Sequence, residues 1–104
     1  MSREIRLKLD DLDDGVPKRV EGGPFGICVA RDGEAVYALA DRCSHQLWFL
    51  SDGEVDLEER TIECTKHGST FSLEDGRPQC LPATKPVDVY PVRREGDEVV
   101  ITAP

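Results

Sequence analysis

The chain has 104 residues, which is enough for one domain and too few for two. Apolar residues make up 38% of the sequence and charged residues 33%, a composition that argues against a wholly disordered chain. Its 13 Lys and Arg against 21 Asp and Glu give a formal charge of −8, which excludes nucleic acid as the main partner because phosphate binding needs a basic face. No apolar run approaches the length of a membrane span, and the charged first residues lack the apolar core of a secretion signal, so we expect a cytoplasmic protein.

Turn signals punctuate the chain about every eight to twelve residues, which is typical of an all-β protein. Between them lie short segments in which apolar and polar residues alternate or apolar residues gather: residues 5–9, 27–30, 35–39, 87–92 and 99–101. Asp32-Gly33 separates the second segment from the third and predicts a β-hairpin. No long segment shows the apolar spacing of an amphipathic helix. We therefore expect a single all-β domain over residues 1–104, a small antiparallel sandwich or barrel in which residues from about 41 to 80 are rich in loops.

This loop-rich segment holds two pairs in which a histidine closely follows a cysteine. Cys43 and His45 form a C-x-H pair, and Cys64 and His67 form a C-x-x-H pair. The two pairs use both histidines of the protein. A thiolate and an imidazole this close in sequence can reach the same metal, and the combination selects zinc, copper or an iron-sulfur centre.

Three other interpretations apply to these pairs. Each residue taken alone could be a structural thiol or imidazole without a metal, but the presence of both histidines beside a cysteine disfavours this. A disulfide between Cys43 and Cys64 is disfavoured in a reducing compartment. A zinc site usually pairs like ligands, whereas here cysteine and histidine alternate along the chain. That order suits two loops that each give one thiolate and one imidazole to a two-iron cluster.

The pattern C-x-H, eighteen intervening residues and then C-x-x-H-G resembles the Rieske [2Fe-2S] family. The likeness extends along nearly the whole chain, because residues 36–45, 50–54, 61–71, 75–76, 81–84 and 89–92 resemble parts of stand-alone bacterial Rieske ferredoxins. Two features depart from the family pattern: Thr65 replaces the common proline after the second-loop cysteine, and the two loops are widely spaced, with the extra length placed near Glu58-Glu59. Neither departure removes a ligand.

The resemblance implies one Rieske-type [2Fe-2S] cluster per chain. Cys43 and Cys64 would bind the inner iron, and His45 and His67 would bind the outer iron near solvent. The resemblance also implies an inserted cluster-binding subdomain of about residues 41–80. Residues 1–40 and 81–104 would then form a basal β domain.

The resemblance also bears on the reduction potential. High-potential members carry an extra cysteine in each cluster loop, but Lys66 occupies the second-loop position here, and Cys28 and Cys80 lie outside the loops. We expect Cys28 to be a core thiol and Cys80 to be unligated. High-potential members also hydrogen-bond the cluster sulfurs from a serine and a tyrosine; Ser69 stands at the serine position, whereas Phe71 at the tyrosine position has no hydroxyl. We therefore expect a potential towards the negative end of the range of roughly −150 to +300 mV.

A small Rieske protein of this kind resembles the ferredoxin component of bacterial aromatic-ring-hydroxylating dioxygenase systems. The resemblance implies an electron carrier and not an enzyme: it would take one electron from a flavin-dependent, NAD(P)H-oxidising reductase and pass it to a terminal oxygenase. Once the four ligands are assigned, no histidine remains for the mononuclear iron site of an oxygenase. The alternatives are a Rieske subunit of another reductase or oxygenase system, and a zinc-stabilised binding module. We expect a monomer that binds neither nucleic acid nor membranes.

Acidic residues gather at residues 10–14 and 54–59. Such groups are usually solvated faces. The second group lies between the two cluster loops in sequence, so its other interpretation is a surface that steers a basic patch of the reductase or oxygenase.

Overall fold

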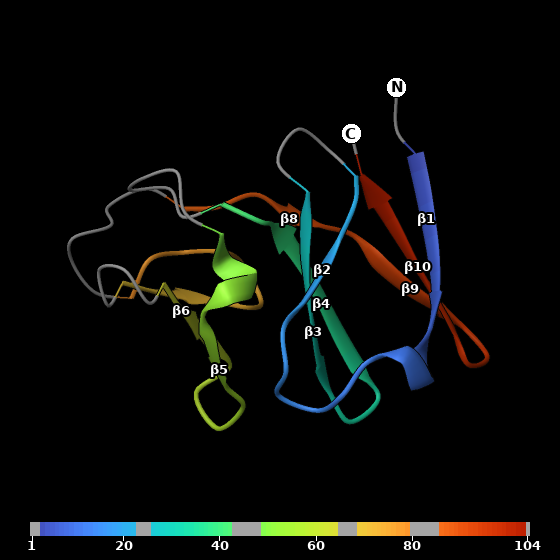
Figure 1. The fold of residues 1–104 in the computed structure, drawn as a ribbon, viewed down its shortest axis with the longest axis horizontal. Helices are drawn as coiled ribbons and strands as arrows, with labels where there is room; N and C mark the ends of the chain where they lie inside the picture. The colour runs from blue at the N-terminus through green and yellow to red at the C-terminus, as the bar shows by residue number, and fades with distance from the viewer. Residues whose placement is uncertain (1–2, 23–25, 43–48, 65–68, 80–85, 104) are drawn as a thin grey trace.

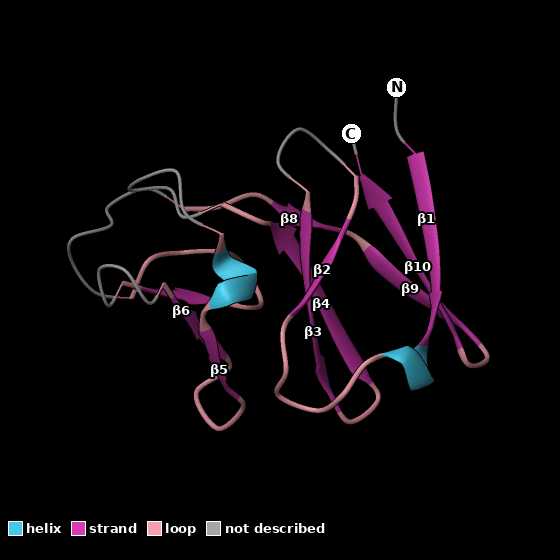
Figure 2. Cartoon of the chain, viewed as in Figure 1, coloured by secondary structure: helices cyan, strands magenta, loops and turns pink. Residues whose placement is uncertain are grey.

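The computed structural model describes residues 3–22, 26–42, 49–64, 69–79 and 86–103, which form short strands joined by turns (Figure 1). The strands of this part of the chain are β1 (Arg3–Lys8), β2 (Lys18–Val20), β3 (Ile27–Asp32), β4 (Ala35–Ala40), β5 (Glu54–Asp56), β6 (Thr61–Glu63), β7 (Thr70–Ser72), β8 (Val89–Tyr90), β9 (Val92–Glu95) and β10 (Glu98–Ala103). Two single-turn 3-10 helices, η1 (Leu9–Asp11) and η2 (Leu50–Asp52), are the helical elements of the described residues (Figure 2). Neither is long and apolar enough to cross a membrane.

The central sheet has the strand order β2-β3-β4-β8 and is buried on both faces. Its strand β3 begins with a continuous apolar run from Ile27 to Ala30, and all four residues have 0% exposure. Successive side chains of a strand point to opposite faces, so Cys28 and Ala30 enter one hydrophobic core while Ile27 and Val29 enter the other. A strand covered on both faces requires such an unbroken run.

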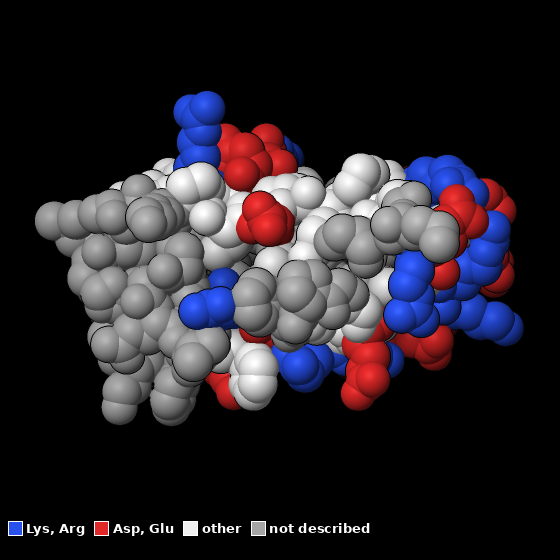
Figure 3. Space-filling view, turned by 90° about the horizontal axis from the view of Figure 1, so that it is seen from above, with Lys and Arg blue, Asp and Glu red and all other residues white. Residues whose placement is uncertain are grey.

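A sheet of order β1-β10-β9 covers one face of the central sheet, and it contains both ends of the described chain (Figure 1). Ile5 of β1 lies opposite Ile101 of β10 in its antiparallel register. Ile101 and Val99 pack with Ile27 and Val29 of the central sheet in the first core. The outer face of this sheet is charged, and Figure 3 shows basic and acidic side chains mixed at this end of the molecule.

A third sheet of order β5-β6-β7 lies on the other side of the central sheet. Val55, Ile62 and Phe71 are cross-strand neighbours in its register and face inward. They form the second core with Cys28 and Leu39 of the central sheet. The residues that alternate with them, such as Glu54 and Asp56 in β5, face outward, as expected for a sheet with one solvated face.

The structure confirms the all-β prediction and the hairpin, whose strands β3 and β4 meet at the turn of Asp32-Gly33. The expected strands at residues 5–9, 87–92 and 99–101 are also present as parts of β1, β8, β9 and β10. The sequence analysis did not predict β2 or the sheet β5-β6-β7, which occupies part of the segment expected to be loop-rich. These four strands have three residues each, too few to show a repeating apolar pattern.

Candidate metal centre

Three of the four predicted ligands, Cys43, His45 and His67, lie outside the described residues, and Cys64 is the one that the structure describes. Among the described residues alone, no group of three or more His, Cys, Asp or Glu side chains could hold a metal. The described residues that flank residues 43–48 and 65–68 show how the ends of both segments are held.

A buried carboxylate stands directly after β4, two residues before the first segment. Asp41 has 0% exposure, and its backbone N–H donates to the carbonyl oxygen of Gly26 at 3.0 Å. Its Oδ1 accepts a hydrogen bond from the backbone N–H of Ser51 at 2.7 Å, and its Oδ2 accepts one from the Ser51 hydroxyl at 2.6 Å. Because Ser51 lies in η2, which follows residues 43–48, this carboxylate joins the two ends of the first segment.

Arg19 of β2 supplies the counter-charge to this carboxylate. Its guanidinium Nη1 lies 2.6 Å from Asp41 Oδ2, and the guanidinium carbon stands 4.3 Å from the centre of the Phe49 ring. The Arg19 side chain remains 42% exposed, and the Phe49 side chain is also exposed. Close packing against Gly26 is possible because that residue has no side chain: a Cβ there would meet the guanidinium at 2.8 Å.

The second segment is closed differently, by backbone pairing. Cys64 directly follows β6 and has 0% exposure. Its backbone N–H donates to the carbonyl oxygen of Ser69 at 2.7 Å, just before β7 begins at Thr70. This bond joins the residue after β6 to the residue before β7, its antiparallel neighbour. Gly53 permits a close approach to the end of β6, because a Cβ on it would stand 1.7 Å from the carbonyl oxygen of Glu63.

The flanks of these segments share one hydrophobic core. Leu50 from the end of the first segment, and Cys64 and Phe71 from either side of the second, are all fully buried in the core that faces the sheet β5-β6-β7. Val87, which follows residues 80–85, belongs to the same core. The fold thus brings the end of the first predicted cluster loop, both sides of the second and the end of the proline-rich segment to one core.

Cys28 lies in this core too, as the sequence analysis predicted for a core thiol. It forms no disulfide. Burial, with a smaller contribution from the charge of Asp41, raises the pKa of the Cys28 thiol well above its usual range. A protonated, buried thiol is a poor nucleophile. Cys80 and Lys66 lie outside the described residues.

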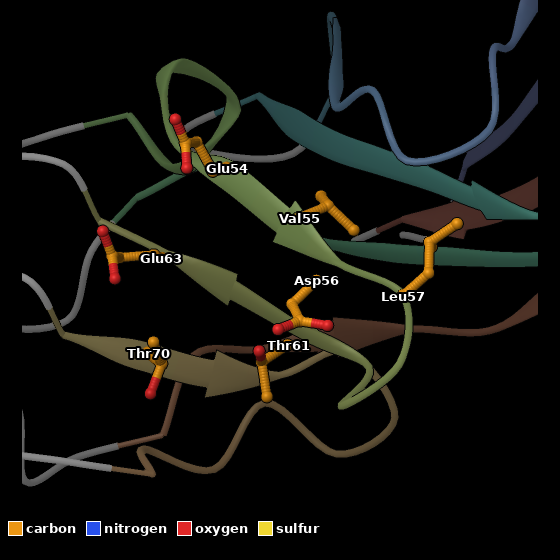
Figure 4. Close-up of a pocket in the computed structure, with 7 residues that line it drawn as sticks. All are labelled: Glu54, Val55, Asp56, Leu57, Thr61, Glu63 and Thr70. Atoms are coloured by element: carbon orange, nitrogen blue, oxygen red, sulfur yellow. The ribbon is translucent and has the colours of Figure 1, made fainter.

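An acidic groove of about 360 Å³ runs along the outer face of β5 and β6 (Figure 4). Glu54 and Glu63 face each other across the two strands, and Asp56 lies farther along β5. No ion pair joins these carboxylates to any cation in the described part of the chain. Sequence analysis singled out the acidic residues from 54 to 59 but missed Glu63, which the register of β5 and β6 places beside them.

Comparison with known proteins identifies the family. The model of the Rieske [2Fe-2S] domain matches residues 5–91. The chain belongs to the Rieske [2Fe-2S] family. A curated relative of this Rieske protein is the 3-phenylpropionate/cinnamic acid dioxygenase ferredoxin subunit of Escherichia coli (strain K12), 36% identical over 104 residues that cover 100% of this chain and 96% of the relative.

Solved structures agree with this relationship. The ferredoxin of carbazole 1,9a-dioxygenase from Nocardioides aromaticivorans IC177 is 36% identical, covers 97% of each chain and superposes with a TM-score of 0.92. A ferredoxin in a complex of reduced oxygenase and oxidized ferredoxin in carbazole 1,9a-dioxygenase is 32% identical, with 93% of this chain and 99% of that chain covered and a TM-score of 0.85. This Rieske protein is therefore a ferredoxin, an electron-transfer component that carries a Rieske-type [2Fe-2S] cluster and is not itself an enzyme.

The described residues fit such a cluster. Cys64 offers a buried thiol directly after β6, and the apolar core around it keeps water from that side of the site. The remaining donors needed for a set of two thiolates and two imidazoles stand in the two segments, which join this core at Leu50 and Cys64. Asp41, Ser51 and Arg19 were not predicted as site residues. The signal available in the sequence was a single carboxylate directly after the apolar run of residues 36–40.

Proposed function

We propose that this ferredoxin takes one electron from a flavin-dependent, NAD(P)H-oxidising reductase and delivers it to a terminal ring-hydroxylating oxygenase. The observation that supports this most directly is the likeness over nearly the whole chain to ferredoxins of aromatic dioxygenase systems, one of which was solved with its oxygenase. The step moves one electron and forms or breaks no covalent bond. The protein part binds the cluster, excludes water from it and presents one edge to each partner in turn.

We further propose that Cys43 and Cys64 hold one iron and that His45 and His67 hold the other. The two histidines of the chain each follow a cysteine, and one core contains both Leu50, which follows the first pair, and Cys64 of the second. When bound, the cluster accepts and returns a single electron. The imidazoles, as the ligands nearer solvent, would form the edge through which a docked partner exchanges that electron.

The buried environment of the site supports a low reduction potential. Phe71 has 0% exposure and carries no hydroxyl that could stabilise a reduced cluster by hydrogen bonding. Glu63, next to Cys64 in sequence, adds a negative charge that opposes the gain of an electron. A strongly positive midpoint in a redox titration would contradict this part of the proposal.

The same proposal divides the domain into a basal part, residues 1–40 and 81–104, and a cluster-binding part of about residues 41–80. The division follows the hydrogen-bonding pattern, because β5, β6 and β7 form a sheet of their own. We also propose that the ferredoxin acts as a cytoplasmic monomer. Sedimentation of the purified protein tests the oligomeric state.

Reconstitution tests the electron-transfer role. Purified ferredoxin is added to NAD(P)H, a flavin-dependent ferredoxin reductase and a terminal oxygenase, with the carbazole 1,9a-dioxygenase components as the first set tried. We expect hydroxylated product only when the ferredoxin is present, with one cluster reduced per electron supplied. A colourless protein that contains zinc and no sulfide, or turnover that does not depend on the ferredoxin, would overturn the proposal.

Ligand variants test the residue assignment. Cys64→Ser and Cys43→Ser should remove the cluster, as measured by iron and sulfide content and by the visible spectrum. Cys28→Ser, the same substitution in the same core, should retain it. His67→Cys should lower the midpoint potential of any cluster that assembles, because a thiolate adds negative charge. An unchanged spectrum and midpoint in His67→Cys would argue against that ligand.

A further inference from the structure

We propose that Asp41 is a positioning residue that closes the base of the first cluster loop and so places Cys43 and His45. This inference rests on the proposed ligand assignment. Asp41 lies two residues before residues 43–48, and its side chain bonds Ser51 in the turn that follows them. Its role is to hold the two ends of the loop at one separation, and no protonation change is required.

Both carboxylate oxygens of Asp41 are used for this purpose. Oδ1 accepts from the Ser51 backbone N–H at 2.7 Å, and Oδ2 accepts from the Ser51 hydroxyl and from Arg19 Nη1, each at 2.6 Å. The Asp41 backbone N–H is held by Gly26 at 3.0 Å. The side chain is completely buried, so its position depends on these partners and not on solvent. Short hydrogen bonds to an ionised group are the strong and directional ones.

The two cluster loops differ in how their ends are joined, and this explains why the first loop uses the Asp41 side chain. The second loop joins paired strands, so a backbone bond from Cys64 to Ser69 closes its base. The first loop leaves β4 in the central sheet and returns in η2, which belongs to no sheet. No strand ladder can fix the separation of its ends. A buried carboxylate that bonds both ends supplies the missing constraint.

Arg19 makes a second link between the same two ends. Its guanidinium bonds Asp41 on one side of the loop and lies 4.3 Å from the ring centre of Phe49, the residue directly after the loop. A buried carboxylate needs a counter-charge, which Arg19 provides from the edge strand β2. The cation–π contact and the ion pair therefore act on the loop ends together.

Three variants of the full-length, cluster-loaded ferredoxin test the proposal: Asp41→Asn, Ser51→Ala and Arg19→Gln. The measurements are the rate of iron release to a chelator, the electron paramagnetic resonance spectrum of the reduced protein and the midpoint potential. We expect Ser51→Ala to speed iron release about tenfold, in line with other residues that orient metal ligands. Shifted or broadened resonances should accompany it, because the imidazole position changes. Ser51→Thr, which keeps the hydroxyl, should restore the wild-type spectrum.

Arg31→Gln is the matched control. Arg31 also makes several hydrogen bonds, to the carbonyl oxygens of Leu9 and Leu12, but on the side of the central sheet away from the cluster loops. It should lower the unfolding temperature without changing the resonance spectrum. Should Asp41→Asn fail to fold, Ser51→Ala and Arg19→Gln decide the question.

Two results would overturn the inference alone: wild-type iron release and spectra in all three variants, or the same changes in Arg31→Gln at an equal loss of stability. A different variant of this ferredoxin tests the ligand assignment. A Cys43→Ser variant that keeps the wild-type cluster would overturn both that assignment and the positioning role built on it.

Discussion

The two outer sheets cover opposite faces of one central sheet, but they differ in whether their outward-facing carboxylates have cation partners. On the sheet β1-β10-β9, Arg93 pairs with Glu4 and Glu95, and Arg6 pairs with Glu95 and Glu98. On the sheet β5-β6-β7, the outward-facing carboxylates of the acidic groove have no cation partner among the described residues. Like charges opposite one another destabilise a sheet, so the second arrangement does not serve stability.

This difference separates a structural side of the molecule from a functional one. The paired side, the sheet β1-β10-β9, holds its glutamates in ion pairs with Arg6 and Arg93, and it contains both ends of the described chain. The unpaired side, the sheet β5-β6-β7 with the core beneath it, contains Cys64 and also Leu50, which follows the first cluster loop. A negative surface at this place disfavours reduction of the cluster and attracts basic partner surfaces. The comparison predicts that matched changes on the two sides have different consequences.

The largest difference is expected between two glycines. Gly53→Ala should disrupt the sheet β5-β6-β7, because its Cβ would stand 1.7 Å from the Glu63 carbonyl oxygen. We expect a loss of about 3 kcal/mol or more in the free energy of unfolding, together with loss of the cluster. Gly96→Ala, in the turn between β9 and β10, meets no atom within 4 Å and is strained only by its positive φ of 68°. It should cost about 1–2 kcal/mol and leave iron content unchanged. Thermal unfolding and iron analysis of both variants check this; equal iron loss would contradict it.

A smaller difference separates the two cores. Leu39 and Ile101 are both fully buried, but Leu39 belongs to the core that contains Cys64, whereas Ile101 belongs to the core of the paired side. Leu39→Ala and Ile101→Ala should each lower the free energy of unfolding by about 2–5 kcal/mol. Only Leu39→Ala should speed release of iron, because only its cavity lies in the core that contains a proposed ligand. Chemical denaturation and chelator kinetics separate the two effects, and equal rates of iron release would break the distinction between the cores.

The parts of the molecule in which a residue pattern repeats could be predicted from the sequence. Alternation and Asp32-Gly33 were enough to predict the central hairpin, and the pairing of each histidine with a cysteine was enough to predict the cofactor and family. Sequence reasoning could not predict the sheet β5-β6-β7, since Glu54-Val55-Asp56 has too few residues to distinguish a strand from a charged turn. It also missed the role of Asp41, whose partners lie 10 and 22 residues away and follow no periodic rule.

A third prediction concerns the reduction potential. Glu63→Gln removes a negative charge from the residue before Cys64, so the reduced state becomes less unfavourable and the midpoint should rise, on the order of 10–30 mV at low salt. Glu98→Gln makes the same chemical change on the paired side, where Arg6 already neutralises the carboxylate. Its midpoint should equal that of the wild type. Redox titrations at low and high salt check the pair, and equal shifts in both variants would show that the groove has no special influence.

The smallest expected effect is the acid sensitivity of the paired side. Hydrogen bonds from Arg93 hold the pKa of Glu4 and of Glu95 below the usual value of 4.5. A carboxyl group with a depressed folded-state pKa contributes stability that is present above its unfolded pKa and is lost as the pH falls through the folded value. Arg93→Gln should therefore be slightly less stable than the wild type near neutral pH, and the difference should disappear well below pH 4.5 and shrink in high salt. Arg77→Gln is the control, because the ion pair between Arg77 and Asp75 is long, at 3.8 Å, and lies in an exposed turn. A difference in stability between the wild type and Arg93→Gln that persists in strong acid would contradict this. It would mean that the aliphatic part of Arg93, which lies opposite buried Val100 in the register, stabilises this sheet more than the charge does.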